Sequence, residues 1–289
     1  MMNVSTEVLL TGLDHPEGPA ELDDGSVVFV ESRRSRVTVW RGGDTSAVFA
    51  VTGGCPNACA VGNDGIYITQ SGGGFGGWEP NEPATPSIQR ITPDRTASTV
   101  VSTVAGQALR APNDLAFGSD GRLWFTDPGT RFDDPEPGWV VGLAPDGSTI
   151  VVDVGPTFPN GVVALDDGAI AWVESVSRRV MRRDTENTTT HLVTLPPGHV
   201  PDGFAVAADG TYVIASIGSG GLDVVAADGT YLDFVEIGGC PLNCAFTNGA
   251  CAGGRLVVAC DPDREPRDAG RLVAVTVPLV AGPLFRGAV

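Results

Sequence analysis

Short apolar stretches with alternating polar positions recur along the chain, separated by turn sequences. The clearest unit has four such segments and two turns: residues 113–117, Ser119-Asp120-Gly121, residues 123–126, residues 139–142, Pro145-Asp146-Gly147 and residues 149–154. Aspartate and glycine in these positions are typical of tight hairpin turns. No segment has the 3.6-residue periodicity of an amphipathic helix. The pattern therefore predicts an all-β protein built from four-stranded antiparallel units.

A proline-led tripeptide opens the first strand of each unit. The six tripeptides are Pro16-Glu17-Gly18, Pro56-Asn57-Ala58, Pro112-Asn113-Asp114, Pro159-Asn160-Gly161, Pro201-Asp202-Gly203 and Pro241-Leu242-Asn243. Each contains one marker residue with an oxygen-bearing side chain, and the steps between successive markers are 40, 56, 47, 42 and 41 residues. A period of this length is typical of one blade of a β-propeller. The sequence therefore predicts a six-bladed β-propeller.

The two ends of the chain are expected to complete one blade together. The sixth repeat reaches a strand at residues 272–277, and the chain then has too little left for a regular outer strand. The segment Thr6 to Leu10 can supply that strand. Pairing the N- and C-terminal segments closes the ring and removes exposed sheet edges. Since no charged or low-complexity linker divides the chain, we expect one domain over residues 1–289.

The charge of the chain narrows the classes of partner. Acidic residues outnumber basic ones 35 to 18, which gives a net charge of −17. Nucleic-acid binding is not expected, because a phosphate backbone is bound by clustered Lys and Arg. No apolar run is long enough to span a membrane. The start at Met1 lacks the features of a signal peptide, so the expected location is the cytoplasm. A small-molecule partner and a monomer or small homo-oligomer are expected.

Four of the six cysteines form two C-x-x-x-C pairs, Cys55 with Cys59 and Cys240 with Cys244. In an extended strand, residues four apart are separated by about 13 Å, so neither pair can form a disulfide. Structural zinc sites use other spacings. We expect buried, reduced thiols.

The marker side chains are the candidate chemistry. Inner strands of a propeller begin near the axis, so the markers converge there. Glu17 and Asp202 supply carboxylates, and Asn113 and Asn160 supply amide oxygens. Such an all-oxygen set suits Ca²⁺, Mg²⁺ or Mn²⁺. One tripeptide alone is more typical of a turn, but recurrence at one phase of the repeat favours a metal site.

A partly open divalent site suggests hydrolysis. A bound divalent cation polarises a carbonyl oxygen and lowers the pKa of bound water. Asp202 is the candidate base, because a carboxylate beside that water can take its proton. Glu17 is expected to anchor the cation.

Two insertions are expected to overhang the entrance to this site. They are Ser71 to Pro86, which contains Phe75 and Trp78, and Asp127 to Gly138. They predict a lid or specificity wall, with plain solvent-exposed insertions as the alternative. The residues expected to contact substrate are Asn57, Arg110, Asp127, Trp78, His199 and Asn243. Other second-strand ends on this face, each equally open to a structural hydrogen bond or a functional contact, are Glu31, Gln70, Glu174, Ser216 and Asp261.

These motifs resemble those of the senescence-marker-protein/gluconolactonase/luciferin-regenerating-enzyme family. The resemblance rests on His15-Pro16-Glu17-Gly18-Pro19, Ala111-Pro112-Asn113-Asp114-Leu115 followed by residues 123–128, Pro159-Asn160-Gly161 and Pro201-Asp202-Gly203. It implies a six-bladed propeller with one catalytic divalent ion, often calcium, and sugar-lactone hydrolysis as the common activity.

The resemblance also implies roles for single residues. Glu17, Asn160 and Asp202 match direct metal ligands, Asn113 matches a metal- or substrate-facing asparagine, and Asp202 matches the presumed base. Two departures stand out. Ala111 replaces the arginine that regucalcin-like members carry two residues before the asparagine, with Arg110 one position further back, and cysteines flank the motifs at Asn57 and Asn243.

The sequence thus predicts a divalent-metal-dependent lactonase that opens a sugar lactone or related cyclic ester with metal-activated water. Ca²⁺ is the first expectation, with Mg²⁺, Mn²⁺, Zn²⁺ or Fe²⁺ as alternatives. One alternative function is metal-dependent hydrolysis, isomerisation or ring opening of a non-sugar substrate, including phosphotriesters. A second is a non-catalytic propeller that only binds a partner.

Overall fold

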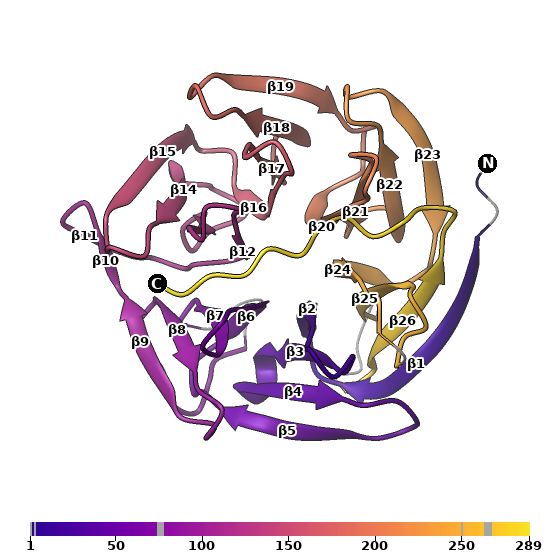
Figure 1. Cartoon of the computed structure of the whole chain (residues 1–289), viewed down its shortest axis with the longest axis horizontal. Coiled ribbons are helices and arrows are strands. Elements are labelled where there is room, and N and C mark those ends of the chain that lie inside the picture. The colour runs from indigo at the N-terminus through magenta and orange to yellow at the C-terminus, as the bar shows by residue number, and fades with distance from the viewer. Residues whose placement is uncertain (1, 3, 74–77, 250, 263–267) are drawn as a thin grey trace.

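Six sheets of four antiparallel strands surround a central axis in the computed structural model of the chain (Figure 1). The structure describes residues 2, 4–73, 78–249, 251–262 and 268–289. Phe75, expected in an entrance loop, lies outside the described residues. The arrangement is the six-bladed β-propeller that the repeats predict, with the innermost strand of each blade beside the axis.

Five blades are built from strands consecutive in sequence. The first contains β2 (Pro16–Glu21), β3 (Val27–Glu31), β4 (Arg36–Trp40) and β5 (Ser46–Val51). The second contains β6 (Pro56–Val61), β7 (Ile66–Gln70), β8 (Ser87–Ile91) and β9 (Ala97–Val101). The third contains β12 (Leu115–Phe117), β13 (Leu123–Asp127), β14 (Gly138–Leu143) and β15 (Thr149–Gly155).

The fourth blade contains β16 (Pro159–Ala164), β17 (Ile170–Glu174), β18 (Arg179–Arg183) and β19 (Thr189–Thr194). The fifth contains β20 (Pro201–Val206), β21 (Tyr212–Ser216), β22 (Gly221–Val225) and β23 (Tyr231–Glu236). A two-stranded ribbon of β10 (Thr103–Val104) and β11 (Gln107–Ala108) joins the second and third blades. The short 3₁₀ helix η1 (Ser32–Arg34) joins β3 to β4.

The sixth blade closes the ring with both ends of the chain. It contains β24 (Cys240–Phe246), β25 (Leu256–Asp261) and β26 (Gly270–Thr276), and β1 (Ser5–Leu13) pairs antiparallel with β26 as the outer strand. The predicted closure is therefore confirmed. Since an outer strand from the other end of the chain satisfies β26, this blade has no unpaired third strand.

Apolar side chains fill the spaces between neighbouring blades. Between the fourth and fifth blades, for example, Ala171 and Val173 pack with Phe204, Tyr212 and Ile214. These side chains are almost fully buried. This packing fixes each blade against the next and leaves the inner strands to surround the axis.

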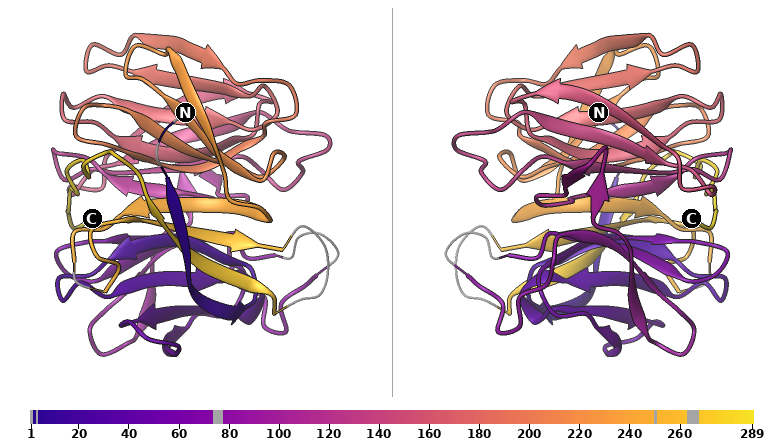
Figure 2. Two further views of the ribbon diagram at one scale, coloured as in Figure 1. Left: turned by 90° about the vertical axis from the view of Figure 1, so that its right-hand side faces the viewer. Right: turned by 90° about the vertical axis from the view of Figure 1, so that its left-hand side faces the viewer.

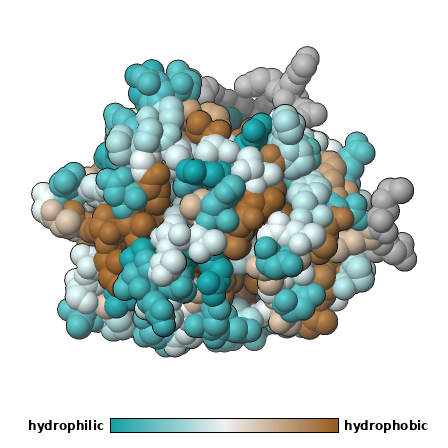
Figure 3. Space-filling view, turned by 90° about the horizontal axis from the view of Figure 1, so that it is seen from above, coloured by the Kyte–Doolittle hydropathy of each residue, from teal (hydrophilic) through white to brown (hydrophobic). Residues whose placement is uncertain are grey.

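The two faces of the ring carry different parts of the chain. Residues 78–86, which precede β8, lie on one face and the carboxyl terminus on the other (Figure 2). Figure 3 shows one side of the rim, where hydrophobic and hydrophilic residues are interspersed. Within the residues that the structure describes, no helix has the length and apolar character needed to cross a bilayer.

Candidate active site

Five of the proline-led tripeptides lie at the starts of inner strands, and Pro112-Asn113-Asp114 directly precedes β12. In five inner strands the pairing register shifts at or directly after the marker, as in β2 between Glu17 and Ala20 and in β20 between Pro201 and Phe204. Such β-bulges locally bend a strand and redirect its side chains. The sequence alternative of an ordinary turn at these five tripeptides is therefore wrong.

Glycine residues allow neighbouring inner strands to approach each other closely at the axis. A Cβ atom on Gly18 would lie 2.3 Å from Ala58 Cα, and one on Gly161 would lie 2.5 Å from the Asp202 carbonyl oxygen. A Cβ on Gly203 would lie 2.0 Å from Asn243 Cγ. Because these contacts exclude any side chain, the glycine after each of these three markers brings neighbouring inner strands together.

Three carboxyl groups gather where these strands begin: Glu17, Asp114 and Asp202. They are 3%, 6% and 7% exposed, respectively. Burial and the nearby Asp202 charge raise the pKa of Glu17 well above its usual value. Burial, and then the charge of Asp114, raise the pKa of Asp202 to about 8, while burial raises the pKa of Asp114 to about 6. Without a positive partner, Asp202 therefore retains its proton near neutral pH.

Two buried amides complete the cluster. Asn160 Nδ2 donates to Ser175 Oγ at 3.1 Å, whereas Asn160 Oδ1 is buried and accepts no hydrogen bond. Asn243 Oδ1 accepts from the Cys244 backbone N–H at 2.8 Å, and Asn243 Nδ2 lies 3.5 Å from Asp114 Oδ1. A buried acceptor without a donor is costly. Beside three carboxyl groups, the Asn160 oxygen is a place where a cation or a substrate donor would be stabilised.

Hydroxyl side chains of second strands hold the marker segments of the next blade. Thr69 Oγ1 donates to the Asn113 carbonyl at 2.5 Å, and Thr126 Oγ1 donates to the Asn160 carbonyl at 2.7 Å. Ser175 Oγ donates to the Pro201 carbonyl at 2.7 Å. These three bonds link consecutive blades and so fix the positions of the markers relative to one another.

The remaining two markers are more accessible. Asn57 and Asn113 are half-buried, in contrast to the four buried markers, Glu17, Asn160, Asp202 and Asn243. The backbone N–H of Asn113 donates to the Thr126 carbonyl at 2.9 Å, which leaves the side chain outside the strand pairing. An incoming molecule can thus reach these two amides.

Arg110 and Asp127 contact each other within the third blade. The buried carboxylate of Asp127 accepts from the backbone N–H groups of Arg110 at 3.0 Å and Ala111 at 2.8 Å. The Arg110 guanidinium donates to the Asp127 carbonyl at 3.1 Å and lies 5.2 Å from the centre of the Trp139 ring. Asp127 therefore anchors the segment that leads into Asn113.

Other second-strand ends anchor entrance segments in the same way. Glu31 Oε2 accepts from the backbone N–H of Asp14 at 3.2 Å, and Gln70 Oε1 accepts from that of Cys55 at 2.6 Å. Glu174 instead accepts from Ser177 and Arg179. These three residues therefore make structural hydrogen bonds, which is one of the two roles that the sequence left open.

His15 and His199 each pair with an aspartate, and Trp78 lines a separate pocket. Nδ1 of His15 lies 2.5 Å from Asp261 Oδ2, between the first and last blades. Nδ1 of His199 lies 2.7 Å from Asp223 Oδ1, and its ring packs 4.9 Å from that of Phe234. Trp78 lines a pocket of about 280 Å³ with Arg33 and Arg34. His199 is thus directed toward the outer part of its blade.

Cys59 and Cys244 lie near the Glu17 carboxyl group as buried thiols. No disulfide joins the six cysteines, which all lie in the described part of the chain; Cys55, Cys59 and Cys244 are buried, whereas Cys240 is half-buried. Burial raises the pKa of the Cys59 and Cys244 thiols far above its usual value. A buried neutral thiol behaves as a small apolar group, so the expectation is confirmed for Cys55, Cys59 and Cys244 but not for the half-buried Cys240.

The donor set can be tested against a divalent cation. Among the described residues, no group of three or more His, Cys, Asp or Glu side chains is arranged so that these side chains alone could hold a metal ion. The candidate set instead combines the carboxyl groups of Glu17 and Asp202 with the unpartnered Asn160 oxygen. Hard cations favour carboxylate and amide oxygens, so the chemistry of these residues fits such an ion.

Sequence reasoning did not single out Asp114 as a functional residue. It occupies the position that glycine occupies in Pro16-Glu17-Gly18, Pro159-Asn160-Gly161 and Pro201-Asp202-Gly203. Its Oδ2 accepts from the backbone N–H of Val162 at 3.0 Å. An acidic residue in place of the repeated glycine was the available signal.

Comparison with known proteins adds to this geometry. The family model of the SMP-30/gluconolactonase/LRE-like region matches residues 15–259. The chain belongs to this family. The match includes Glu17, Asn113, Asn160 and Asp202, so the resemblance seen in the sequence motifs is confirmed.

Three individual proteins are similar to this chain. A gluconolactonase from Zymomonas mobilis is 25% identical over 85% of this chain and 77% of its own length. A solved structure from Xanthomonas campestris, described as a gluconolactonase, has a TM-score of 0.75 and 26% identity over 96% of this chain and 90% of that chain. Diisopropyl-fluorophosphatase from Loligo vulgaris is 26% identical over 43% of this chain and 46% of its own length.

Proposed function

We propose that this protein is a lactonase, a hydrolase that opens the ester bond of a lactone with water at the carboxylate cluster. Two gluconolactonases support the reaction class, because each resembles the chain over most of its length. The single observation that carries the proposal is the buried grouping of Glu17, Asp114 and Asp202 beside the unpartnered Asn160 oxygen. A propeller that only binds a partner would not need such a set.

We propose further that the cluster holds a divalent cation, with Ca²⁺ as the first candidate. Glu17, Asp202 and Asn160 would hold it directly, and Asn113 would face it or the substrate. When bound, such a cation would polarise the lactone carbonyl and make water more acidic. Because ligand carboxylates must be ionised, its binding is expected to release protons from Glu17 and Asp202.

Asp202 is the proposed proton acceptor. A water oxygen forms a bond to the carbonyl carbon while Asp202 takes the water proton. The bond from that carbon to the ring oxygen then breaks, and the proton passes to the departing oxygen, which gives a hydroxy acid. A carboxylate that holds a cation is ionised, so Asp202 would be ready to accept the water proton and return it.

The more accessible amides are proposed to position the substrate. Asn57 and Asn113 can donate hydrogen bonds to a lactone oxygen and accept them from hydroxyl groups. Asn243 is also a proposed substrate contact, and its side chain lies next to Asp114. Arg110, Asp127, Trp78 and His199 stay proposed contacts of the entrance, although Arg110, Asp127 and His199 already have partners within their blades.

The test is hydrolysis of a lactone panel, from gluconolactone to aryl lactones, by chelator-stripped protein. The expected result is turnover restored by Ca²⁺, Mg²⁺, Mn²⁺, Zn²⁺ or Fe²⁺ in the natural protein and lost in Asp202→Asn. Tight cation binding without opening of any lactone would overturn the reaction. Full turnover in the stripped protein would overturn only the dependence on a cation.

A second candidate reaction is hydrolysis at phosphorus. The partial match to diisopropyl-fluorophosphatase covers 43% of this chain. Because the same cluster would serve both reactions, diisopropyl fluorophosphate belongs in the substrate panel. Faster turnover of this compound than of every lactone would favour the second candidate. A small-molecule substrate, a cytoplasmic location and a monomer or small homo-oligomer stay predictions.

A further inference from the structure

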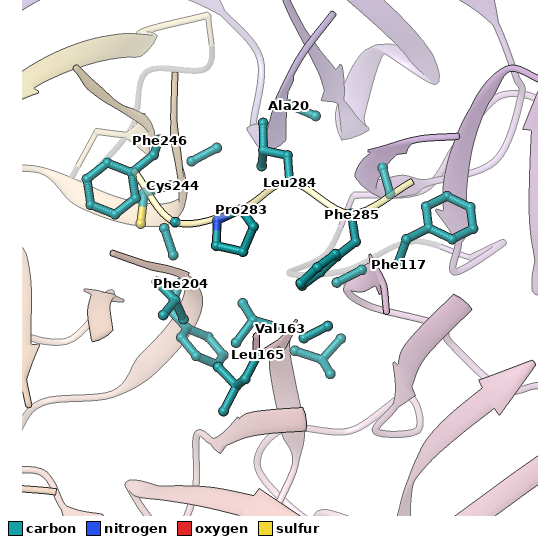
Figure 4. A pocket seen from close by; sticks show the side chains of 18 of the residues that line it. Ala20, Phe117, Val163, Leu165, Phe204, Cys244, Phe246, Pro283, Leu284 and Phe285 are labelled. Atoms are coloured by element: carbon teal, nitrogen blue, oxygen red, sulfur yellow. The ribbon is translucent and has the colours of Figure 1, made fainter. Parts of the chain in front are cut away.

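A pocket of about 600 Å³ occupies the end of the channel opposite to the entrance. The last residues of the inner strands form its wall, and Asp114 and Asn243 of the cluster also line it. Its apolar lining includes Ala20, Phe117, Val163, Leu165, Phe204 and Phe246 (Figure 4). The pocket therefore lies directly behind the carboxylate cluster and belongs to the other face of the ring.

The C-terminal strap, residues 280–289, crosses this end of the channel (Figure 1). On one side it is held by the fifth blade, where the Ala208 backbone N–H donates to Val280 at 2.8 Å and Gly282 donates to Val206 at 3.1 Å. On the other side the Asn63 backbone N–H donates to the Gly287 carbonyl at 2.8 Å. The strap thus joins opposite sides of the ring.

The strap is fitted closely to the strand ends. A Cβ atom on Gly282 would lie 2.5 Å from the Val206 carbonyl oxygen, and one on Gly287 would lie 2.5 Å from that of Gly121. Between these glycines, Pro283 and Phe285 face the other apolar side chains across the pocket (Figure 4). The strap therefore supplies part of the apolar wall.

The charged side chains that line this pocket, apart from the exposed Asp166, have hydrogen-bond or ion-pair partners. Arg182 pairs with Asp167, and Arg286 pairs with Asp23. The Glu21 carboxylate accepts from the backbone N–H groups of Asn248 at 2.8 Å and Gly249 at 2.5 Å. No unpaired charge among these groups requires a charged occupant, and apolar walls offer water few hydrogen bonds.

We propose that this pocket is a second ligand site, which takes a neutral, largely hydrocarbon molecule of one or two rings. Its volume and its mostly aromatic and aliphatic lining are those of small-molecule sites. Burial of such a ligand against four phenylalanine rings would be favourable. The ligand would lie between the inner strands and the strap, separate from the substrate entrance.

The test is fluorescence titration with N-phenyl-1-naphthylamine, a neutral two-ring dye whose emission rises in apolar surroundings. The expected result is saturable binding of one dye per chain. Ala20→Phe places a ring in the pocket and should weaken binding at least tenfold. The matched control Ala47→Phe makes the same change at an exposed position of β5 and should leave binding unchanged.

Two further variants make the test decisive. Ala116→Phe fills the pocket from another blade, in case Ala20→Phe unfolds the protein as judged by circular dichroism. Glu17→Gln alters the cluster and should leave dye binding intact. Absence of saturable binding to the natural protein, unchanged binding in both folded filling variants, or loss of binding in Glu17→Gln alone would overturn the proposal. Failure of the lactone assay would not affect this result.

Discussion

The two ends of the channel are made by the same six inner strands, yet their chemistry is opposite. At the entrance, β20 begins with the buried carboxyl group of Asp202, while four residues along the same strand Val206 lines an apolar pocket. The glycines that follow the markers bring the polar ends together, and a strap crosses the apolar ends. In this propeller, the inner strands therefore carry the polar groups of the candidate site at their starts and apolar side chains at their ends.

The largest expected difference is between one substitution at the start of β20 and one at a residue of the same strand that lines the apolar pocket. Asp202→Asn should lower the turnover of a lactone by about 1000-fold, because it removes the proposed proton acceptor and a cation ligand. Phe204→Leu should leave turnover within about threefold and cost about 1 kcal/mol of stability. Steady-state kinetics and denaturant unfolding measure both. Equal losses of turnover in the two variants would contradict the division of the channel.

The second prediction concerns stability and pH in the cation-free protein. The unfolded chain gives up the Asp202 proton near its ordinary value, whereas burial and the Asp114 charge raise the folded pKa to about 8. The folded state therefore binds more protons between about pH 4 and pH 8, and the free energy of unfolding should fall as the pH rises through this window. The slope is about 1.4 kcal/mol per pH unit for each such proton.

Denaturant unfolding between pH 5 and pH 8.5 checks this slope. Asp202→Asn should flatten it, and the exposed control Asp133→Asn should not. Saturating Ca²⁺ should also flatten it if the cation replaces the protons. Stability that rises with pH over the same range in the natural, cation-free protein would contradict the raised pKa.

The third prediction concerns the hydrogen bonds that hold the marker segments in place at the entrance. Thr126→Val removes the bond to the Asn160 carbonyl and the acceptor, at 3.1 Å, for the Asp114 backbone N–H. Leaving these groups unpaired should cost about 1 to 3 kcal/mol and should also weaken cation affinity. Thr38→Val removes a bond to Glu31 at 2.6 Å, away from the markers. It should reduce stability and leave cation affinity unchanged, as calorimetry would show.

The smallest expected effect separates the ion pairs of the two ends. Arg286→Gln at the strap loses a pair with Asp23, which is 87% exposed, and should change stability by less than about 0.5 kcal/mol. Arg36→Gln at the entrance leaves the fully buried Glu31 with fewer donors and should cost about 1 to 2 kcal/mol. Similar losses in the free energy of unfolding for Arg286→Gln and Arg36→Gln, measured by chemical unfolding, would contradict this difference between the two ends.

Much of the fold could be predicted from local pattern. Asp-Gly turns, apolar alternation and the repeated proline-led tripeptides indicated six blades and their inner strands, because these features act over a few residues. The pairing of β1 with β26 followed from the length of the last repeat. The start of β12 at Leu115 was missed by two residues, because the segment before it is held by side chains of β13.

The site was harder to predict where it depends on contacts between blades. Asp114 joins Glu17 and Asp202 only after three separate strands converge, and its clue was a missing glycine. Asp127 is a loop anchor because its carboxylate reaches backbone groups of its own blade. The strap and its pocket depend on residues 280–289 crossing the axis, and no periodicity marks that path.

The most direct measurement is calorimetric titration of Ca²⁺ into the cation-free protein near pH 7, in two buffers that differ in ionisation enthalpy. The account predicts one saturable site, release of protons on binding, and loss of both in Glu17→Gln/Asp202→Asn. Binding with unchanged affinity in that double variant would contradict the claim that the carboxylate cluster holds the cation. Absence of binding to the natural protein would contradict it as well.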